Sequence, residues 1–475
     1  MNFKKEDILG KQCRHITYCV SKDGKDDALF VKEWIYLKDG RAVPNLKMIE
    51  NMERDFWVVK PGRRTFKDKI QYISIHDCNK NSCREVDLLR KADLALGGNG
   101  FVRTKGELFK SPYLFGCGVK PQSLVKNAYN TKWPEYRTRK ALACMGDTET
   151  DVLNGTEEII IGTMCFKEHG ILLIDRHFFN GTPDSIILEK LNLKIKELLG
   201  DILLERKMQL EIRLVNNAGE VAKGMLDFAH KHKPDFVSFW NINFDIKKMI
   251  QALEKYGYDT AQCFSDPSVP EKYKFFKYRE GPAVKTIHDG STKNLNPEQR
   301  WHVVACPATF FFIDGMTLYY RLRMAAGLEE GYSLDAVLDR NLNITKLKID
   351  EISHLTGIDW HKEMQANYKY EYCAYGLFDG ISTELLDEET NDIAIKLPAQ
   401  SSNSDFTDFK SDPKKTADDM HYHALKHDYV MGVVEGDIRD DNDKHVVDVF
   451  DWIVTLDAYM SYDIGIKAVD VWREE

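Results

Sequence analysis

The sequence predicts a mixed α/β protein, with a sheet of mixed strand directions flanked by helices. Three apolar, strand-like segments occur between residues 142 and 175, and the short polar connections between them are typical of antiparallel neighbours. Apolar residues then recur at helical spacing over 185–199, and a second helical pattern leads into an apolar strand at 234–240. Strands and helices interleaved in this way favour the α/β class. The first three strands are expected at residues 142–148, 158–166 and 171–175.

The region before this sheet is predicted to be a separate N-terminal domain. It contains strand-like segments at residues 16–20, 30–37 and 70–75. A basic stretch at 133–140 links it to the next domain, and its cations are expected either to contact phosphate or to lie in solvent. The predicted organisation is an N-terminal domain at 1–138, a central domain at 139–395, a connecting region at 396–445 and a final segment at 446–475.

Composition and charge exclude several classes of protein. The chain has 475 residues, enough for about two to four domains, and its 43% hydrophobic content is ordinary for a globular protein. The first residues are polar and charged, and no apolar run is long enough to span a membrane. The net charge of −9 argues against a simple basic nucleic-acid binder, but it does not exclude a nuclease whose basic groove is local. We therefore expect a cytoplasmic protein with no membrane partner.

The cysteines and a group of histidines do not form a convincing zinc site. Cys78 and Cys83, taken with His76, have loose spacing, and no second ligand pair matches them. Reduced thiols in a cytosolic protein are the better interpretation. His421, His423 and His427 lack a further ligand in the sequence around them, so we expect them to lie on a helix surface.

Asp147 and Glu149 close the first predicted strand of the central region. On a β-strand, side chains at i and i+2 point to the same face, so these two carboxylates would meet at one spot. Two such charges repel each other unless a cation lies between them or one of them is protonated. Hard oxygen ligands suit Mg²⁺ or Mn²⁺. The alternative is a solvated turn at the end of the strand.

Two later elements add further carboxylates. Asp245 follows the strand at 234–240, where a helix is expected from residue 246, so its alternative role is to cap that helix. Tyr375 and Asp379 have i, i+4 spacing, which places them on one face of a predicted helix. An ordinary exposed pair is the alternative for these two residues.

In chain order, Asp-x-Glu, Asn-x-x-Phe-Asp and Tyr-x-x-x-Asp resemble the motifs of the proofreading 3′→5′ exonuclease domain of family B DNA polymerases. That domain belongs to the ribonuclease H-like DEDD exonucleases, and the last motif marks their tyrosine subclass. Two further segments, residues 310–316 and 332–337, are similar to parts of the same family. The resemblance implies a ribonuclease H-like fold for residues 139–395 and 3′→5′ exodeoxyribonuclease activity within a DNA-directed DNA polymerase.

The resemblance also implies roles for individual residues. Two Mg²⁺ or Mn²⁺ ions would hydrolyse phosphodiester bonds at DNA 3′ ends, and Tyr375 would orient the attacking water. Asn241 and Phe244 would contact the DNA, with Asn241 beside the 3′ nucleotide. The implied metal ligands are Asp147, Glu149, Asp245 and Asp379.

The last segment resembles the first palm motif of family B polymerases. Asp457 ends a strand-like run and is followed five residues later by Tyr462. The resemblance implies that Asp457 binds metal and that Tyr462 blocks a ribose 2′-hydroxyl. Asp463 stands where the family has proline and Met460 where it has serine, while Asp451 offers a competing register. The alternative is a strand and helix with no chemistry.

The sequence contains no Asp-Thr-Asp pair for a second palm carboxylate and no fingers motif. Because nucleotidyl transfer needs both palm carboxylates, we expect a second polypeptide to supply the rest of the palm, the fingers and the thumb. A split bacteriophage gene acting in the host cytoplasm fits this expectation, and a truncated polymerase is the other explanation. Two further alternatives are a stand-alone DEDD exonuclease and a non-catalytic scaffold subunit of a replication complex.

Two polar stretches are predicted to be loops. Residues 258–300 are long enough to be a functional insertion, and residues 399–405 are rich in small polar side chains.

Overall fold

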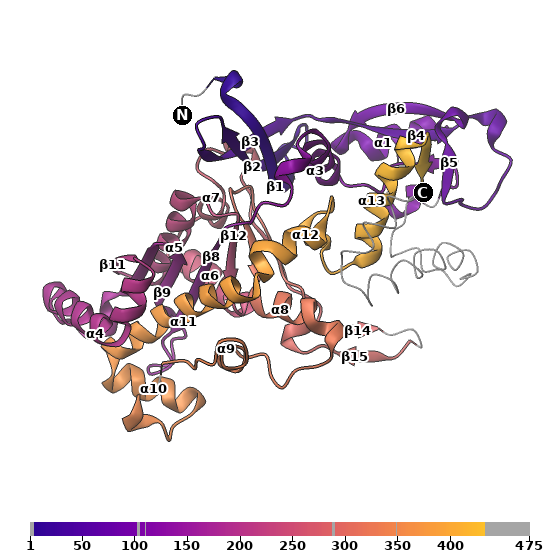
Figure 1. Ribbon diagram of the computed structural model, residues 1–475. Helices are drawn as coiled ribbons and strands as arrows, with labels where there is room; N and C mark the ends of the chain where they lie inside the picture. Colours follow the sequence, from indigo (N-terminus) through magenta and orange to yellow (C-terminus); the bar gives the residue numbers. More distant parts are fainter. Residues whose placement is uncertain (1–3, 102–104, 110, 287–289, 348, 433–475) are drawn as a thin grey trace. The chain divides into compact units, whose positions relative to one another are not determined.

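The chain folds into two compact units (Figure 1). The structure is a computed structural model that describes residues 4–101, 105–109, 111–286, 290–347 and 349–432. Within these limits, the first unit contains residues 4–50, 125–324 and 328–410, and the second contains 51–124, 325–327 and 411–432. Asp457 and Tyr462, the two residues of the predicted palm motif, lie outside the described residues.

The centre of the first unit is a six-stranded mixed sheet with the order β11-β10-β9-β8-β12-β17. Neighbouring strands β8, β9 and β10 are antiparallel, as predicted, whereas β12 and β17 continue the sheet parallel to β8. Strand β11 pairs with β10 in parallel at the other edge. The strands are β8 (Ala143–Thr150), β9 (Ile159–Phe166), β10 (His169–Asp175), β11 (Gln209–Val215), β12 (Phe236–Phe239) and β17 (Phe311–Asp314).

Helices cover both faces of this sheet, which confirms the predicted mixed α/β class (Figure 1). Successive side chains of a strand alternate between faces, and β10 shows this clearly. Its Leu173 packs in the core that contains helices α5 and α6, whereas Leu172 packs in the core that contains α4 and α11. The helices are α4 (Asp184–Glu205), α5 (Ala218–His232), α6 (Ile242–Lys255) and α11 (Lys369–Thr390).

A three-stranded antiparallel sheet at the N-terminal end belongs to the same unit. Its strands β1 (Ile8–Val20) and β2 (Asp27–Leu37) include the predicted segments 16–20 and 30–37, and β3 (Ala42–Glu50) completes it. A buried ion cluster joins this sheet to the start of β12. The Asp235 carboxylate lies 3.1 Å from Arg14 Nε and 3.7 Å from Lys32 Nζ.

The second unit is built around a smaller sheet of β6 (Cys78–Arg84), β4 (Glu53–Val59) and β7 (Leu114–Phe115). Helix α1 (Leu88–Leu96) packs on this sheet. The predicted strand at 70–75 is only β5 (Tyr72–Ser74), which pairs with β18 (Tyr429–Met431). All ten cysteines of the chain are free thiols, and Cys78 and Cys83 lie in different hydrophobic cores.

Helix α13 (Asp412–Lys426) carries His421 and His423, and His427 is its C-cap residue. His423 and His427 follow the prediction of a helix surface, because neither side chain is buried. His421 does not lie on the helix surface, because its side chain is 3% exposed and packs against the ring of Trp57. The prediction was wrong for this residue because the helix places one of its faces on the small sheet.

The two stretches predicted to be loops contain short elements. The described residues between 258 and 300 form one α-helix, two 3-10 helices and three short strands, and two of these strands, β14 and β15, pair in antiparallel. Residues 399–401 are helical, since Pro398 is favourable at a helix start. The remaining helices and strands are α2 (Lys105–Phe109), α3 (Pro121–Lys132), α7 (Thr260–Phe264), β13 (Lys277–Arg279), β14 (Val284–Thr286), β15 (Thr292–Asn294), β16 (Val303–Ala305), α8 (Gly315–Arg323), α9 (Leu334–Leu342), α10 (Gly357–Asn367) and α12 (Leu397–Ser401).

Among the residues that the structure describes, no helix has the length and apolar character needed to cross a bilayer.

Candidate metal centre

The C-terminal half of β8 presents two carboxylates to the face of the sheet that α11 covers. Asp147 pairs with Thr163 of β9, and Glu149 pairs with Ile161, so both side chains point to the same face. Helix α11 approaches this face closely because it has glycines there. A Cβ atom at Gly380 would lie 3.1 Å from Cys165 Sγ, closer than an ordinary van der Waals contact, and one at Gly376 would just touch Glu149 Cγ at 3.5 Å.

Helix α11 brings Asp379 to these two carboxylates. Asp147, Glu149 and Asp379 each offer one oxygen, and the three oxygens lie within 4.8 Å of one another. Tyr375 lies one turn earlier on the same helix, as its i, i+4 spacing predicts. Asp379 and Tyr375 are both buried, so the alternative of an ordinary exposed pair is wrong.

Asp245 lies beside this triad. Helix α6 begins at Ile242, four residues earlier than predicted, so Asp245 falls in the first turn and not at the N-cap. Its Oδ1 accepts hydrogen bonds from the backbone N (3.2 Å) and the hydroxyl (2.7 Å) of Thr148, the residue between Asp147 and Glu149. The structure therefore brings three of the four predicted ligands together, and the fourth, Asp245, is hydrogen-bonded to the same strand, β8.

The two residues predicted to contact DNA lie at the exposed start of α6. Asn241 occupies the N-cap position, but its side chain makes no capping hydrogen bond. Phe244 is 42% exposed, and the Nζ of Lys248 lies 5.9 Å from the centre of its ring. An exposed aromatic ring with a nearby cation is a suitable surface for stacking a nucleobase.

Burial and mutual repulsion disfavour the charged forms of the carboxylates. Burial raises the pKa of Asp147 well above its ordinary value, and the charges of Glu149 and Asp379 raise it further. Burial likewise raises the pKa of Glu149 to about 7. Burial is also the main reason that the pKa of Asp379 and that of Asp245 are raised. A cation between these groups would remove most of this cost.

Lys346 supplies a positive charge that the sequence patterns do not predict. Its Nζ donates hydrogen bonds to the hydroxyl of Tyr375 (2.9 Å) and to Asp379 Oδ2. Burial would lower the pKa of Lys346, but the carboxylates of Asp379, Asp147 and Glu149 raise it above the ordinary lysine value. Lys346 lies between α9 and α10, outside any periodic segment, so no local pattern marks it.

Asp314, at the end of β17, is a buried carboxylate with a structural role and serves as a comparison for the triad. Asp314 ends β17, and its Oδ1 accepts a hydrogen bond from Thr317 N (2.7 Å) at the start of α8. Its Oδ2 accepts one from Ile242 N (3.2 Å). Both oxygens of Asp314 are therefore used by the backbone, even though burial raises its pKa to about 7.

The donor set of the triad fits a hard divalent cation. In contrast to Asp314, Asp379 has a buried oxygen, Oδ1, with no hydrogen-bond partner among the described residues. Buried polar atoms are nearly always paired, so this oxygen indicates a missing ligand. Carboxylate oxygens in this number and spacing suit Mg²⁺ or Mn²⁺.

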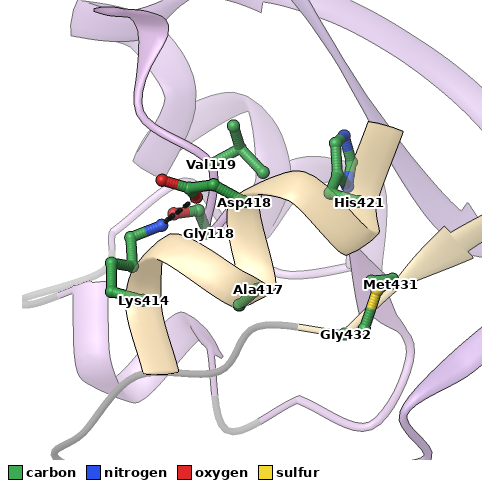
Figure 2. Close-up of a pocket in the computed structure, with 9 residues that line it drawn as sticks. Gly118, Val119, Lys414, Ala417, Asp418, His421, Met431 and Gly432 are labelled. Atoms are coloured by element: carbon green, nitrogen blue, oxygen red, sulfur yellow. Dashed lines mark hydrogen bonds and ion pairs between the residues drawn. The ribbon is translucent and has the colours of Figure 1, made fainter. Parts of the chain in front are cut away.

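A small pocket in the second unit differs from this carboxylate triad. It lies between α13 and the segment around Gly118 (Figure 2). Lys414, its cation, donates hydrogen bonds to Asp418 and to the carbonyl oxygen of Gly118 (3.1 Å), so the charges in this pocket are paired within the protein.

No protein-family model matches the chain, and no curated protein is similar to it in sequence. The chemistry of the site therefore rests on its own residues.

Proposed function

We propose that this chain is a metal-dependent 3′→5′ exonuclease of the DEDD type that hydrolyses phosphodiester bonds at DNA 3′ ends. The observation that carries the proposal is the convergence of Asp147, Glu149 and Asp379 within 4.8 Å, with Tyr375 beside them. Hydrolysis of a phosphodiester adds negative charge to a group that is already anionic. A cluster of carboxylates suits this reaction only as a holder of cations.

The residues of the site have distinct roles in this proposal. Asp147, Glu149 and Asp379 would hold the metal ions, with Asp245 completing the set from α6. Two bound divalent ions would stabilise the attacking and leaving oxygens and would lower the pKa of a bound water. Tyr375 would orient the attacking water by a hydrogen bond. Lys346 already contacts Tyr375 and fixes the direction of its hydroxyl.

The architecture of the first unit supports a ribonuclease H-like domain. Strands β8, β12 and β17 are parallel, so their carboxyl ends meet at one edge of the sheet. Asp147 and Glu149 lie in the C-terminal half of β8, and the first turn of α6, with Asp245, follows β12 directly. One antiparallel neighbour, β9, completes the mixed sheet that such a domain requires.

The substrate is inferred from the same edge of the sheet. Phe244 would stack on a base near the 3′ end, and Asn241 would contact the terminal nucleotide. Together with the order of the three motifs, this arrangement favours the proofreading domain of a family B DNA polymerase. A stand-alone DEDD nuclease that acts on DNA or RNA is the second candidate, since the site itself does not require a polymerase.

The test is digestion of a single-stranded DNA labelled at its 5′ end, with Mg²⁺ or Mn²⁺. We expect shortening from the 3′ end, and loss of this activity in the double variant Asp147→Ala, Glu149→Ala. A matched control is Glu189→Ala with Glu205→Ala, which removes two exposed carboxylates from α4. Equal rates in the active-site double variant and the control would refute the site. A wild-type chain without nuclease activity would favour the scaffold alternative.

A further inference from the structure

A second tyrosine of α11 contacts the metal centre. Tyr372 lies one turn before Tyr375, and the two rings stack in parallel with their centres 5.9 Å apart. The hydroxyl of Tyr372 donates a hydrogen bond of 2.5 Å to Glu149 Oε2. Tyr372 is only 1% exposed, so water cannot replace this contact.

Two residues of α10 fix the direction of this hydrogen bond. Gln365 Nε2 donates to the Tyr372 hydroxyl at 3.2 Å, and His361 Nδ1 lies 2.9 Å from the same oxygen. A phenolic hydroxyl has one proton and acceptor capacity on its oxygen. When both neighbours donate, the single proton of Tyr372 is available only for Glu149.

Gln365 also holds the end of β8. It is fully buried, and its Nε2 donates to the carbonyl oxygen of Thr150 at 2.8 Å. Its Oε1 accepts hydrogen bonds from the backbone N of Val152 and of Leu153, each at 3.0 Å. One amide group therefore fixes both Tyr372 and the chain directly after Glu149.

We propose that Tyr372 is a positioning residue that fixes the Glu149 carboxylate for metal binding, with Gln365 holding Tyr372 and the end of β8 in place. This inference rests on the proposed function, because it takes Glu149 to be a metal ligand. A hydrogen bond to one carboxylate oxygen restricts the rotation of the side chain and directs the other oxygen. Partners of this kind commonly contribute about 10- to 100-fold to metal affinity or activity.

The test compares Tyr372→Phe with Tyr370→Phe in the full chain. Tyr370 lies on the same helix but packs against Phe179, away from Glu149, so its variant controls for loss of a phenol from α11. Mn²⁺ affinity is measured by titration calorimetry without DNA. We expect about 10-fold weaker binding in Tyr372→Phe and unchanged binding in Tyr370→Phe.

A rate measurement separates positioning from a purely structural role. The nuclease rate of Tyr372→Phe should be low at limiting Mn²⁺ and should return to the wild-type value at saturating Mn²⁺. A rate that stays low at saturating metal would overturn the inference, and so would an unchanged Mn²⁺ affinity. Gln365→Met removes the hydrogen bond that Gln365 donates to the Tyr372 hydroxyl, and we expect this variant to bind Mn²⁺ more weakly as well.

The failure of this inference differs from the failure of the proposed function. If the wild-type chain and the Asp147→Ala, Glu149→Ala variant bind Mn²⁺ equally weakly, the metal centre itself is wrong and this inference is overturned with it. If the wild-type chain binds Mn²⁺ at the triad and Tyr372→Phe binds it equally well, only the positioning role is overturned.

Discussion

Replacing Asp147 by asparagine should stabilise the protein when metal is absent and remove its response to metal. The three clustered carboxylates repel one another, and Lys346 contacts only Asp379 directly among them. Asparagine keeps the size and shape of the side chain but carries no charge. The change therefore removes repulsion from the metal-free state and removes a ligand from the metal-bound state.

The spacing of the triad sets the size of the effect. Two unit charges 4.8 Å apart repel by about 3.5 kcal/mol at an effective dielectric constant of about 20. Asp147 has two such neighbours, but Lys346 offsets part of the repulsion, and partial protonation of the cluster relieves more of it. We therefore expect Asp147→Asn to raise the free energy of unfolding without metal by about 1–3 kcal/mol.

Thermal unfolding in EDTA and in saturating Mn²⁺ measures this effect. The wild-type melting temperature should rise on addition of Mn²⁺, because a ligand that binds only the folded state stabilises it. The melting temperature of Asp147→Asn should lie a few degrees above that of the wild type in EDTA and should not respond to Mn²⁺. Asp314→Asn is the matched control, since this buried carboxylate caps α8 and its loss should lower stability under both conditions.

Two results would refute the reasoning. One is a lower melting temperature for Asp147→Asn than for the wild type in EDTA, which would mean that Asp147 stabilises the empty site. The other is a full Mn²⁺ response in the variant, which would show that the ion binds elsewhere.

Three further predictions concern other parts of the chain. Tyr375→Phe should lower the single-turnover nuclease rate by about 100-fold without changing Mn²⁺ affinity in calorimetry, and a weaker affinity would make this tyrosine structural. Asp235→Leu leaves Arg14 and Lys32 buried without their partner, so urea unfolding should show a loss of about 3–5 kcal/mol, and a neutral effect would contradict this account. Burial lowers the pKa of His421 to about 4, so the unfolded chain takes up a proton first as pH falls below the ordinary value of 6.5. The contribution of His421 to stability should therefore fall by about 1–2 kcal/mol between pH 6.5 and pH 5, and urea unfolding should show that His421→Gln loses less stability than the wild type over this range.

Periodicity predicted the parts of the fold and the site that depend on neighbouring residues in sequence. The two-residue spacing of Asp147 and Glu149 and the four-residue spacing of Tyr375 and Asp379 each place a pair on one face, and the structure has both pairs. The antiparallel order of β8 to β10 followed from the short connections between these strands.

Contacts between distant residues account for what the sequence did not predict. Helix α6 starts four residues earlier than predicted, where Ile242 N donates to Asp314, which lies 72 positions away. Lys346 reaches the site from a connection with no periodic pattern, and Gln365 reaches β8 from a helix 215 positions after Thr150. His421 is buried where α13 packs against the smaller sheet, with its ring beside that of Trp57.

The ion cluster at Asp235 has a consequence for synthesis of the chain. Lys32 donates a hydrogen bond to the carbonyl oxygen of Lys233, 201 positions later, and Arg14 is even further along the chain from its partner Asp235. At about 5–20 residues per second, a ribosome needs roughly 10–40 s to make that intervening stretch. During this interval the hairpin of β1 and β2 can form locally, while Arg14 and Lys32 remain hydrated. The buried positions of Arg14 and Lys32 therefore stay open to solvent until residue 235 has been synthesised, and exposed strands can pair with other chains during this interval.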